Sequence, residues 1–277
     1  MGGTKCLGLL VDAHGAIIDR ERQVTNVDAV IETFAEIAQT LRRRSPEPVL
    51  GVGVGVPGLV DFDGVLRAGP HLPGVYNLPV AQRLGAALDL RVVAENDATC
   101  ATLAESVLGA ARDARNAVLI TVGTGIGAGF VLNGVLHRGA HGFAGELGHM
   151  CVQPDGPLCI CGRRGCWELY ASGQRADAEV TALARAGDPA AVAILDDLSK
   201  WLAVGLANIC LAWDPDRIVI GGGVLERVGE LIVTRTRAHL AEQFGHAASL
   251  RALPEIVAAL LGPDAGAIGA ALIARQP

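Results

Sequence analysis

The chain has 277 residues, of which 51% are hydrophobic and 19% are charged. This composition is that of a folded globular protein with one large or two medium domains, and it excludes a disordered chain. The formal net charge of −6 argues against nucleic acid or an anionic membrane as the main partner. With no apolar run long enough to span a membrane and no secretion-type N-terminus, the sequence predicts a cytoplasmic protein.

Strand and helix patterns alternate along the first part of the chain. A short apolar segment at 7–11, a turn and a second segment at 16–22 predict a hairpin. Apolar residues at helical spacing predict a helix over roughly 27–43. Two further strands and one helix are expected at about 49–56, 91–94 and 98–109.

The same alternation continues in the second part of the chain. A strand at 117–122 opens into Gly123-Thr-Gly-Ile-Gly127, and Asn133-Gly134 predicts a tight hairpin. Strands are expected at 128–132, 135–138 and 217–220, and helices at about 174–186, 190–212 and 264–275. Strands that alternate with helices in this way indicate an α/β protein.

One cluster of potential metal ligands stands out: His149, Cys159, Cys161 and Cys166. One imidazole and three thiolates complete a tetrahedral zinc site and leave no position for a reacting water. Coincidental cysteines in a glycine-rich loop are the alternative. This alternative explains poorly why Gly162 and Gly165 frame the turn that leads to Cys166. The remaining cysteines are interpreted as small hydrophobic residues: Cys6, Cys100, Cys151 and Cys210.

Three glycine-rich segments are candidate phosphate-binding loops. Gly2-Gly-Thr4 and Gly123-Thr-Gly125 each precede a hairpin, which suggests a duplicated domain, and Gly221-Gly-Gly223 ends a strand before a helix. Glycine lets backbone N–H groups approach a phosphate closely, although each loop alone could be an ordinary turn. A fourth segment, 53–58, matches G-x-G-x-x-G but contains Pro57 and is followed by no helix pattern, which argues against a dinucleotide site.

These motifs together resemble the ROK family of bacterial sugar kinases and repressors. The resemblance rests on Gly2-Gly-Thr-Lys5, Glu95-Asn-Asp97, Gly123-Thr-Gly-Ile-Gly127, Gly145-Glu-Leu-Gly-His149 and Cys159-x-Cys-Gly-x-x-Gly-Cys166-x-Glu168. It implies an actin-like ATPase (ribonuclease H-like) fold of two α/β domains with ATP and sugar in the cleft between them, and commonly a homodimer. The implied domains are 1–108 plus 263–277 and 109–262, the second with the zinc-binding segment 149–166.

The resemblance also implies roles for individual residues. Asp97 matches the catalytic base, although the start of a predicted helix also allows it to be a cap. The implied sugar contacts are Gly58, Asn96, Asp97, Glu146, His149 and Glu168. The implied nucleotide contacts are Gly3, Thr4, Lys5, Gly123, Thr124, Gly125, Gly222 and Gly223. Mg²⁺ is expected with ATP, and zinc is expected to be structural.

The leading hypothesis is an ATP-dependent kinase that converts glucose to glucose 6-phosphate. Kinases of N-acetylglucosamine, N-acetylmannosamine or fructose are alternatives. The family motif Asp-x-Gly-Gly-Thr-Lys has an aspartate before the position of Met1. We therefore expect either a start downstream of the true one or a catalytically impaired sugar-binding protein. A repressor is the least expected, because its DNA-binding domain precedes the kinase region.

Overall fold

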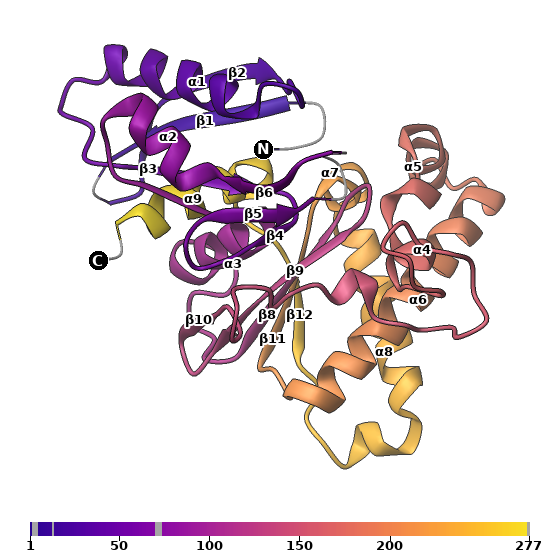
Figure 1. Cartoon of the computed structure of the whole chain (residues 1–277). Helices are drawn as coiled ribbons and strands as arrows, with labels where there is room; N and C mark the ends of the chain where they lie inside the picture. The colour runs from indigo at the N-terminus through magenta and orange to yellow at the C-terminus, as the bar shows by residue number, and fades with distance from the viewer. Residues whose placement is uncertain (2–4, 13, 70–73, 276–277) are drawn as a thin grey trace. The chain divides into compact units, whose positions relative to one another are not determined.

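The structure is a computed structural model that describes residues 1, 5–12, 14–69 and 74–275 (Figure 1). It divides into two compact units and confirms the α/β class. Unit 1 comprises Met1–Leu108, Leu136–Ala144 and Asp264–Pro277, and unit 2 comprises Gly109–Val135 and Gly145–Pro263. The sequence-based division requires one correction: residues 136–144 group with unit 1. Leu136 packs against the apolar cluster around Cys100 in that unit.

Unit 1 contains three small sheets. β1 (Lys5–Val11) and β2 (Ile17–Val24) form the expected antiparallel hairpin. β3 (Val52–Val56) pairs in parallel with β7 (Val92–Asn96). The third sheet joins β4 (Leu59–Val60), β5 (Val65–Ala68) and β6 (Tyr76–Pro79). The helices of this unit are α1 (Val30–Arg44), α2 (Val80–Leu88), α3 (Asp97–Val107) and α9 (Ala265–Ala274).

Tight packing of α9 against its neighbours fixes the position of α3. A Cβ atom at Gly53 of β3 would collide with the carbonyl of Ala270, and one at Gly269 would collide with the carbonyl of Cys100. Both positions therefore require glycine for the backbones to approach so closely. α3 begins directly at the carboxyl end of β7, so this packing fixes Asp97 at the junction of strand and helix.

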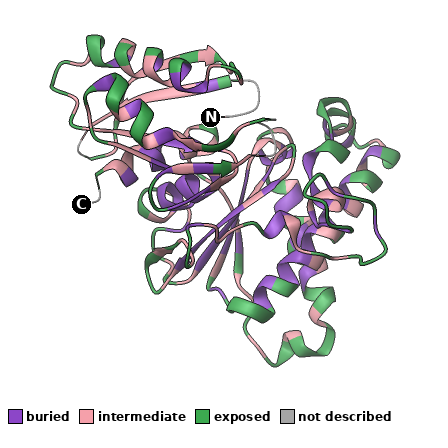
Figure 2. Ribbon diagram, viewed as in Figure 1, coloured by how far each residue is buried: buried purple, intermediate pink, exposed green. Residues whose placement is uncertain are grey.

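Unit 2 is built on one five-stranded sheet in the order β10-β9-β8-β11-β12. Its strands are β8 (Ala117–Val122), β9 (Ile126–Leu132), β10 (Val135–His137), β11 (Arg217–Gly221) and β12 (Glu255–Ala258). β8 pairs with β9 antiparallel, whereas β11 lies parallel to both β8 and β12. β8, β9 and β11 are largely buried (Figure 2), as their continuous apolar runs predict.

The turn chemistry of unit 2 agrees with its sequence. Asn133 and Gly134 both have positive φ, at 53° and 79°, as a two-residue β-hairpin turn requires. The helices are α4 (Glu168–Ala171), α5 (Ala178–Arg185), α6 (Pro189–Trp213), α7 (Gly223–Val228) and α8 (Glu230–Phe244). Short 3₁₀ turns occur at Leu147–His149, Gly173–Arg175, Gly245–Ser249 and Gly262–Asp264. Within the described part of the chain, no helix combines the length and apolarity needed to cross a membrane.

Candidate functional site

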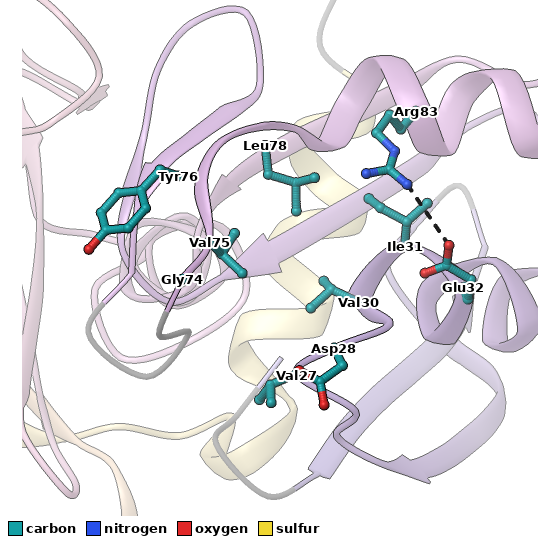
Figure 3. A pocket seen from close by; sticks show the side chains of 10 residues that line it. All are labelled: Val27, Asp28, Val30, Ile31, Glu32, Gly74, Val75, Tyr76, Leu78 and Arg83. Atoms are coloured by element: carbon teal, nitrogen blue, oxygen red, sulfur yellow. Dashed lines mark ion pairs between the residues drawn. The ribbon is translucent and has the colours of Figure 1, made fainter.

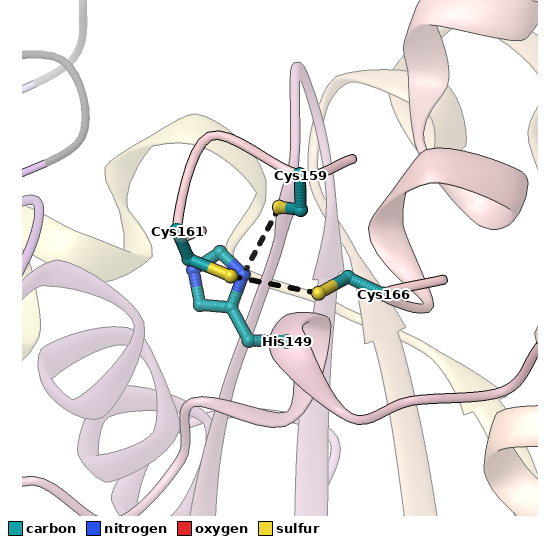
Figure 4. A group of neighbouring side chains, drawn as sticks. All are labelled: His149, Cys159, Cys161 and Cys166. Atoms are coloured by element: carbon teal, nitrogen blue, oxygen red, sulfur yellow. Dashed lines mark hydrogen bonds between the residues drawn. The ribbon is translucent and has the colours of Figure 1, made fainter. Parts of the chain in front are cut away.

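The four potential zinc ligands converge in unit 2. One ligand atom from each of His149, Cys159, Cys161 and Cys166 lies within 4.8 Å of all the others (Figure 4). The Sγ atoms of Cys161 and Cys166 are 3.5 Å apart, and Sγ of Cys159 is 3.6 Å from Nδ1 of His149. A zinc ion about 2.3 Å from each sulfur requires edges of roughly 3.8 Å between sulfurs. The measured separations are close to this, so the residues fit a tetrahedral zinc ion.

The electrostatics of the thiols also indicate a cation. Burial raises the pKa of the Cys166 thiol to about 12, and burial likewise raises the pKa of Cys159. Both thiols are therefore poor thiolates at neutral pH without a positive charge beside them. A bound divalent ion supplies that charge and holds coordinating thiols in the deprotonated form.

The loop that carries the cysteines has its own backbone scaffold. Antiparallel bridges join Cys151 to Cys166 and Leu158 to Arg164, so the two arms of the loop face each other. Gly165 has a φ of +64°, and a Cβ atom there would collide with the carbonyl of Gln153. Glycine at this position therefore lets the arms approach closely enough for the thiols to meet.

Two carboxylates flank the imidazole of His149. Nδ1 of His149 faces Cys159 and lies 3.3 Å from Oε1 of Glu168, whereas Nε2 lies 3.8 Å from Oε2 of Glu146. The Glu146 side chain is 41% exposed and the Glu168 side chain 18% exposed. If a metal takes Nδ1, Nε2–H is left as a donor beside the accessible carboxylate of Glu146.

Trp167 anchors this group of residues to the core of unit 2. Its side chain is fully buried, and its indole N–H donates to the carbonyl of Trp201 at 2.7 Å. The ring packs on Gly205, where a Cβ atom would collide with it. Because Trp167 lies between Cys166 and Glu168, this contact with α6 fixes both the last thiol and the second carboxylate.

The two predicted glycine loops of unit 2 lie next to each other. Gly123–Gly125 follows β8 and Gly222–Gly223 follows β11, and these strands are parallel neighbours. Gly222 has a φ of +87°, and a Cβ atom there would lie 2.7 Å from the backbone of Val122. Loops at the carboxyl ends of adjacent parallel strands are the usual ligand-binding edge of an α/β sheet. Gly125 also lies against the carboxylate of Glu168, which connects the glycine loops to the cluster around His149.

Unit 1 holds a second group of predicted site residues at the end of β7. Asn96 is the N-cap of α3: its Oδ1 accepts from the N–H of Thr99, and its Nδ2 donates to the carbonyl of Gly58, each at 3.0 Å. Oδ1 of Asp97 accepts from the N–H of Ala98 at 2.9 Å. The structure therefore brings Gly58, Asn96 and Asp97 together. It also assigns the helix cap to Asn96 and not to Asp97.

Two residues near this group have no role in the sequence-based interpretation. The Glu95 carboxylate is fully buried and forms an ion pair with Arg138. Burial raises the pKa of Glu95 above its usual range, and the guanidinium of Arg138 opposes that rise. The Glu95-Asn-Asp97 motif could have drawn attention to Glu95. Arg138 follows a hairpin in an irregular segment, where no spacing rule indicates it.

Other predicted site residues differ in what the structure says of them. Gly3 and Thr4 lie outside the described residues, and Lys5 is the exposed first residue of β1. The G-x-G-x-x-G match at 53–58 leads into the short strand β4 and not into a helix, as its context predicts.

Unit 1 also has a hollow of about 270 Å³ beside α1 and β6 (Figure 3). Apolar side chains such as Val30 and Val75 line it, and Arg83 and Glu32 face each other at 3.9 Å on its rim. None of the described site residues lines this hollow, so we assign it no part in the chemistry.

Comparison with known proteins adds the family to this geometry. The ROK family model matches residues 1–277. The chain belongs to the ROK family. It is 32% identical to a glucokinase of Streptomyces coelicolor over 100% of this chain and 96% of that protein. It is 33% identical to an N-acetylmannosamine kinase of Escherichia fergusonii over 99% of this chain and 96% of that protein.

Solved structures give the same fold. A ROK family glucokinase from Streptomyces griseus, in complex with glucose and AMPPNP, superimposes with a TM-score of 0.91 at 32% identity. The alignment covers 100% of this chain and 98% of that protein. The actin-like α/β fold of ROK sugar kinases, predicted from the motifs, is thereby confirmed.

Proposed function

We propose that this ROK protein is an ATP-dependent hexose kinase and that glucose is its leading substrate. The observation that carries the proposal is the arrangement around His149, whose Nε2 lies 3.8 Å from Glu146 and whose Nδ1 lies 3.3 Å from Glu168. Two carboxylates and one imidazole N–H offer the acceptors and donor that neighbouring sugar hydroxyls need. The glucose and AMPPNP in the Streptomyces griseus relative support the same choice of ligands.

In the proposed mechanism, Asp97 is the general base. Its carboxylate takes the proton of the sugar hydroxyl as that oxygen forms its bond to the γ-phosphorus, and the bond to ADP breaks. Asn96 is held by its bonds to Gly58 and Thr99 and is therefore a rigid neighbour that can position a second hydroxyl. Phosphoryl transfer depends mainly on such positioning.

The metals have separate parts in this proposal. Zinc bound by His149, Cys159, Cys161 and Cys166 fixes the imidazole and the segment that carries Glu168, and it takes no part in phosphoryl transfer. Mg²⁺ arrives with ATP and neutralises phosphate charge when bound. Lys5 and the glycine loops 123–125 and 222–223 are the proposed nucleotide contacts, together with Gly3 and Thr4.

Sequence similarity does not distinguish the sugars. The glucokinase and the N-acetylmannosamine kinase are 32% and 33% identical to this chain. Kinases of N-acetylhexosamines or of fructose therefore stay as alternatives for the same site. The homodimer and the cytoplasmic location that the family resemblance implies stay predictions.

A coupled ADP-release assay tests the proposal directly. We expect ADP release with glucose to exceed that with mannose, fructose, N-acetylglucosamine and N-acetylmannosamine, while ATP without sugar gives the background. A higher kcat/KM with another sugar would replace glucose and leave the kinase in place. Glucose binding by calorimetry without turnover would instead identify a non-catalytic sugar-binding protein, and binding of no sugar would reject the proposal.

A further inference from the structure

We propose that Glu95 and Arg138 form a buried positioning pair that holds the Asn96–Asp97 corner of unit 1. This inference rests on the proposed function, because it assigns the pair to the orientation of the sugar-binding amide and the catalytic carboxylate. Neither residue is proposed to touch the substrate. Both act through the backbone and side chains of the residues that do.

The first observation is where the Glu95 carboxylate points. Glu95 lies in β7, opposite Gly55 of β3, and none of its side chain is exposed. Its Oε1 accepts from the backbone N–H of Asn96 at 2.7 Å. The buried carboxylate is thus bonded directly to the first residue of the Asn96–Asp97 corner.

The second observation is how Arg138 holds the other carboxylate oxygen. The Nε of Arg138 pairs with Oε2 of Glu95, and its guanidinium lies 4.6 Å from the ring centroid of Phe62. The Arg138 side chain is 26% exposed. An aromatic face on one side and a buried carboxylate on the other limit the guanidinium to one orientation.

The third observation is that the segment carrying Arg138 is itself fixed to unit 1. The N–H of Ala144 donates to the carbonyl of Arg138 at 3.1 Å. A Cβ atom at Gly142, whose φ is +87°, would lie 2.6 Å from the carbonyl of Val60. Arg138 is therefore presented by a short closed loop that packs on the β4–β5 hairpin.

Charge balance explains why the pair matters for the corner. A buried carboxylate that loses its cation must either become protonated or move toward water, and breaking such a pair is strongly unfavourable. Either change weakens the acceptor for the N–H of Asn96. Asn96 also caps α3 and contacts Gly58, so its displacement would shift Asp97, the next residue. Small displacements of reacting groups can cost about 100-fold in rate.

The test combines activity with a readout that does not depend on activity. We propose Arg138→Met, Glu95→Gln and the double variant, with Arg67→Met as the control. Arg67 also pairs with an enclosed carboxylate of unit 1, that of Asp61 at 2.6 Å, but no bond links Asp61 to Asn96 in the described contacts. Hydrogen exchange at the Asn96 amide and kcat with the best sugar are measured for each protein.

We expect Arg138→Met to accelerate exchange at the Asn96 amide about tenfold and to lower kcat by about tenfold or more. The double variant removes the unpaired charge, so its exchange and kcat should recover toward wild type relative to Arg138→Met. Arg67→Met should lower the melting temperature at most and leave both values within about twofold.

Exchange and kcat in Arg138→Met that match those of Arg67→Met would overturn the proposal and leave a purely structural ion pair. If Arg138→Met does not fold, Glu95→Gln carries the same test. It keeps the shape of Glu95 but opposes a Gln N–H₂ to the guanidinium, and unchanged exchange there would also overturn the proposal. Because exchange is read without substrate, an inactive wild-type protein would reject the kinase function but still test the pair.

Discussion

At the scale of single residues, the corner at the end of β7 separates two roles that the sequence leaves open. A polar residue at the start of a helix can be a cap or a catalytic group. Asn96 makes the capping bond to Thr99, and Asp97 is the first residue of α3. The capping role therefore no longer competes with catalysis as an explanation for the Asp97 carboxylate, which supports the proposal that it is the base.

The Asp97→Asn variant tests that role. The amide is nearly isosteric with the carboxylate but does not accept a proton, so we expect kcat to fall by about 10²–10⁴-fold while the Kd for the sugar changes little. Steady-state kinetics and calorimetry measure the two effects separately. Asp113→Asn, at a side chain that is 82% exposed, is the matched control. Turnover near wild type in Asp97→Asn would remove Asp97 from its proposed role.

At the scale of elements, the segment 149–168 is a loop that depends on its ligands for order. Only isolated bridges and single hydrogen bonds connect its arms, and the apolar side chains of Leu158 and Ile160 are 64% and 78% exposed. The loop therefore buries little apolar surface at its tip to offset the entropy of ordering its backbone. A bound zinc ion supplies this free energy instead.

We expect Cys161→Ser to lower the zinc content of the purified protein from about one ion per chain to a small fraction. Because Cys161 is exposed, the substitution leaves the packing of the core unchanged. Elemental analysis measures the zinc, and limited proteolysis should become faster within the loop. Cys151→Ser, an exposed thiol outside the ligand set, is the control. Full zinc content in Cys161→Ser would show that the cluster does not bind zinc in the way we describe.

The sequence predicts those elements whose side-chain pattern is long or punctuated by turn residues. The hairpins around 12–15 and 133–134, the strand of 117–122 and the long helix of 190–212 are all confirmed with small shifts at their ends. β4 and β12 escaped prediction because two and four residues are too short to show a period. α8 escaped as well, since its buried face includes Thr236 among the apolar residues.

The predicted site follows the same logic. Ligands clustered within one segment, such as His149 and Cys159, can be recognised from their spacing, and the structure brings them together. The pair of Glu95 and Arg138 could not be predicted, because it joins elements far apart in the sequence. Only the folded backbone of unit 1 makes these two residues neighbours.

At the scale of the whole molecule, each unit has its own set of buried charges, and the one in unit 2 makes stability depend on pH. His239 on α8 donates to Asp196 on α6 and to Glu242, both at 2.9 Å, and Asp196 also pairs with Lys200 and Arg235. Burial alone would lower the pKa of His239, but the carboxylates of Glu242 and Asp196 raise it above its ordinary value. A charged imidazole thus links α6 to α8.

The sign of the effect follows from this raised pKa. The unfolded histidine has a pKa of about 6.5, so its contribution is complete below that pH and is lost as the pH rises through the higher folded pKa. We expect the melting temperature of wild type to fall by on the order of 1–3 °C more between pH 6 and pH 9 than that of His239→Gln. His246→Gln, at an exposed position, controls for the loss of one histidine. Parallel curves for wild type and His239→Gln would contradict the assignment.

The central claim is that this chain transfers the γ-phosphate of ATP to a sugar hydroxyl, and ³¹P NMR of the reaction mixture tests it most directly. With glucose, ATP and Mg²⁺, the account predicts the sugar phosphomonoester resonance of glucose 6-phosphate, growing in step with ADP and absent with Asp97→Asn. Release of ADP and inorganic phosphate without any sugar phosphomonoester, for every hexose tested, would contradict it.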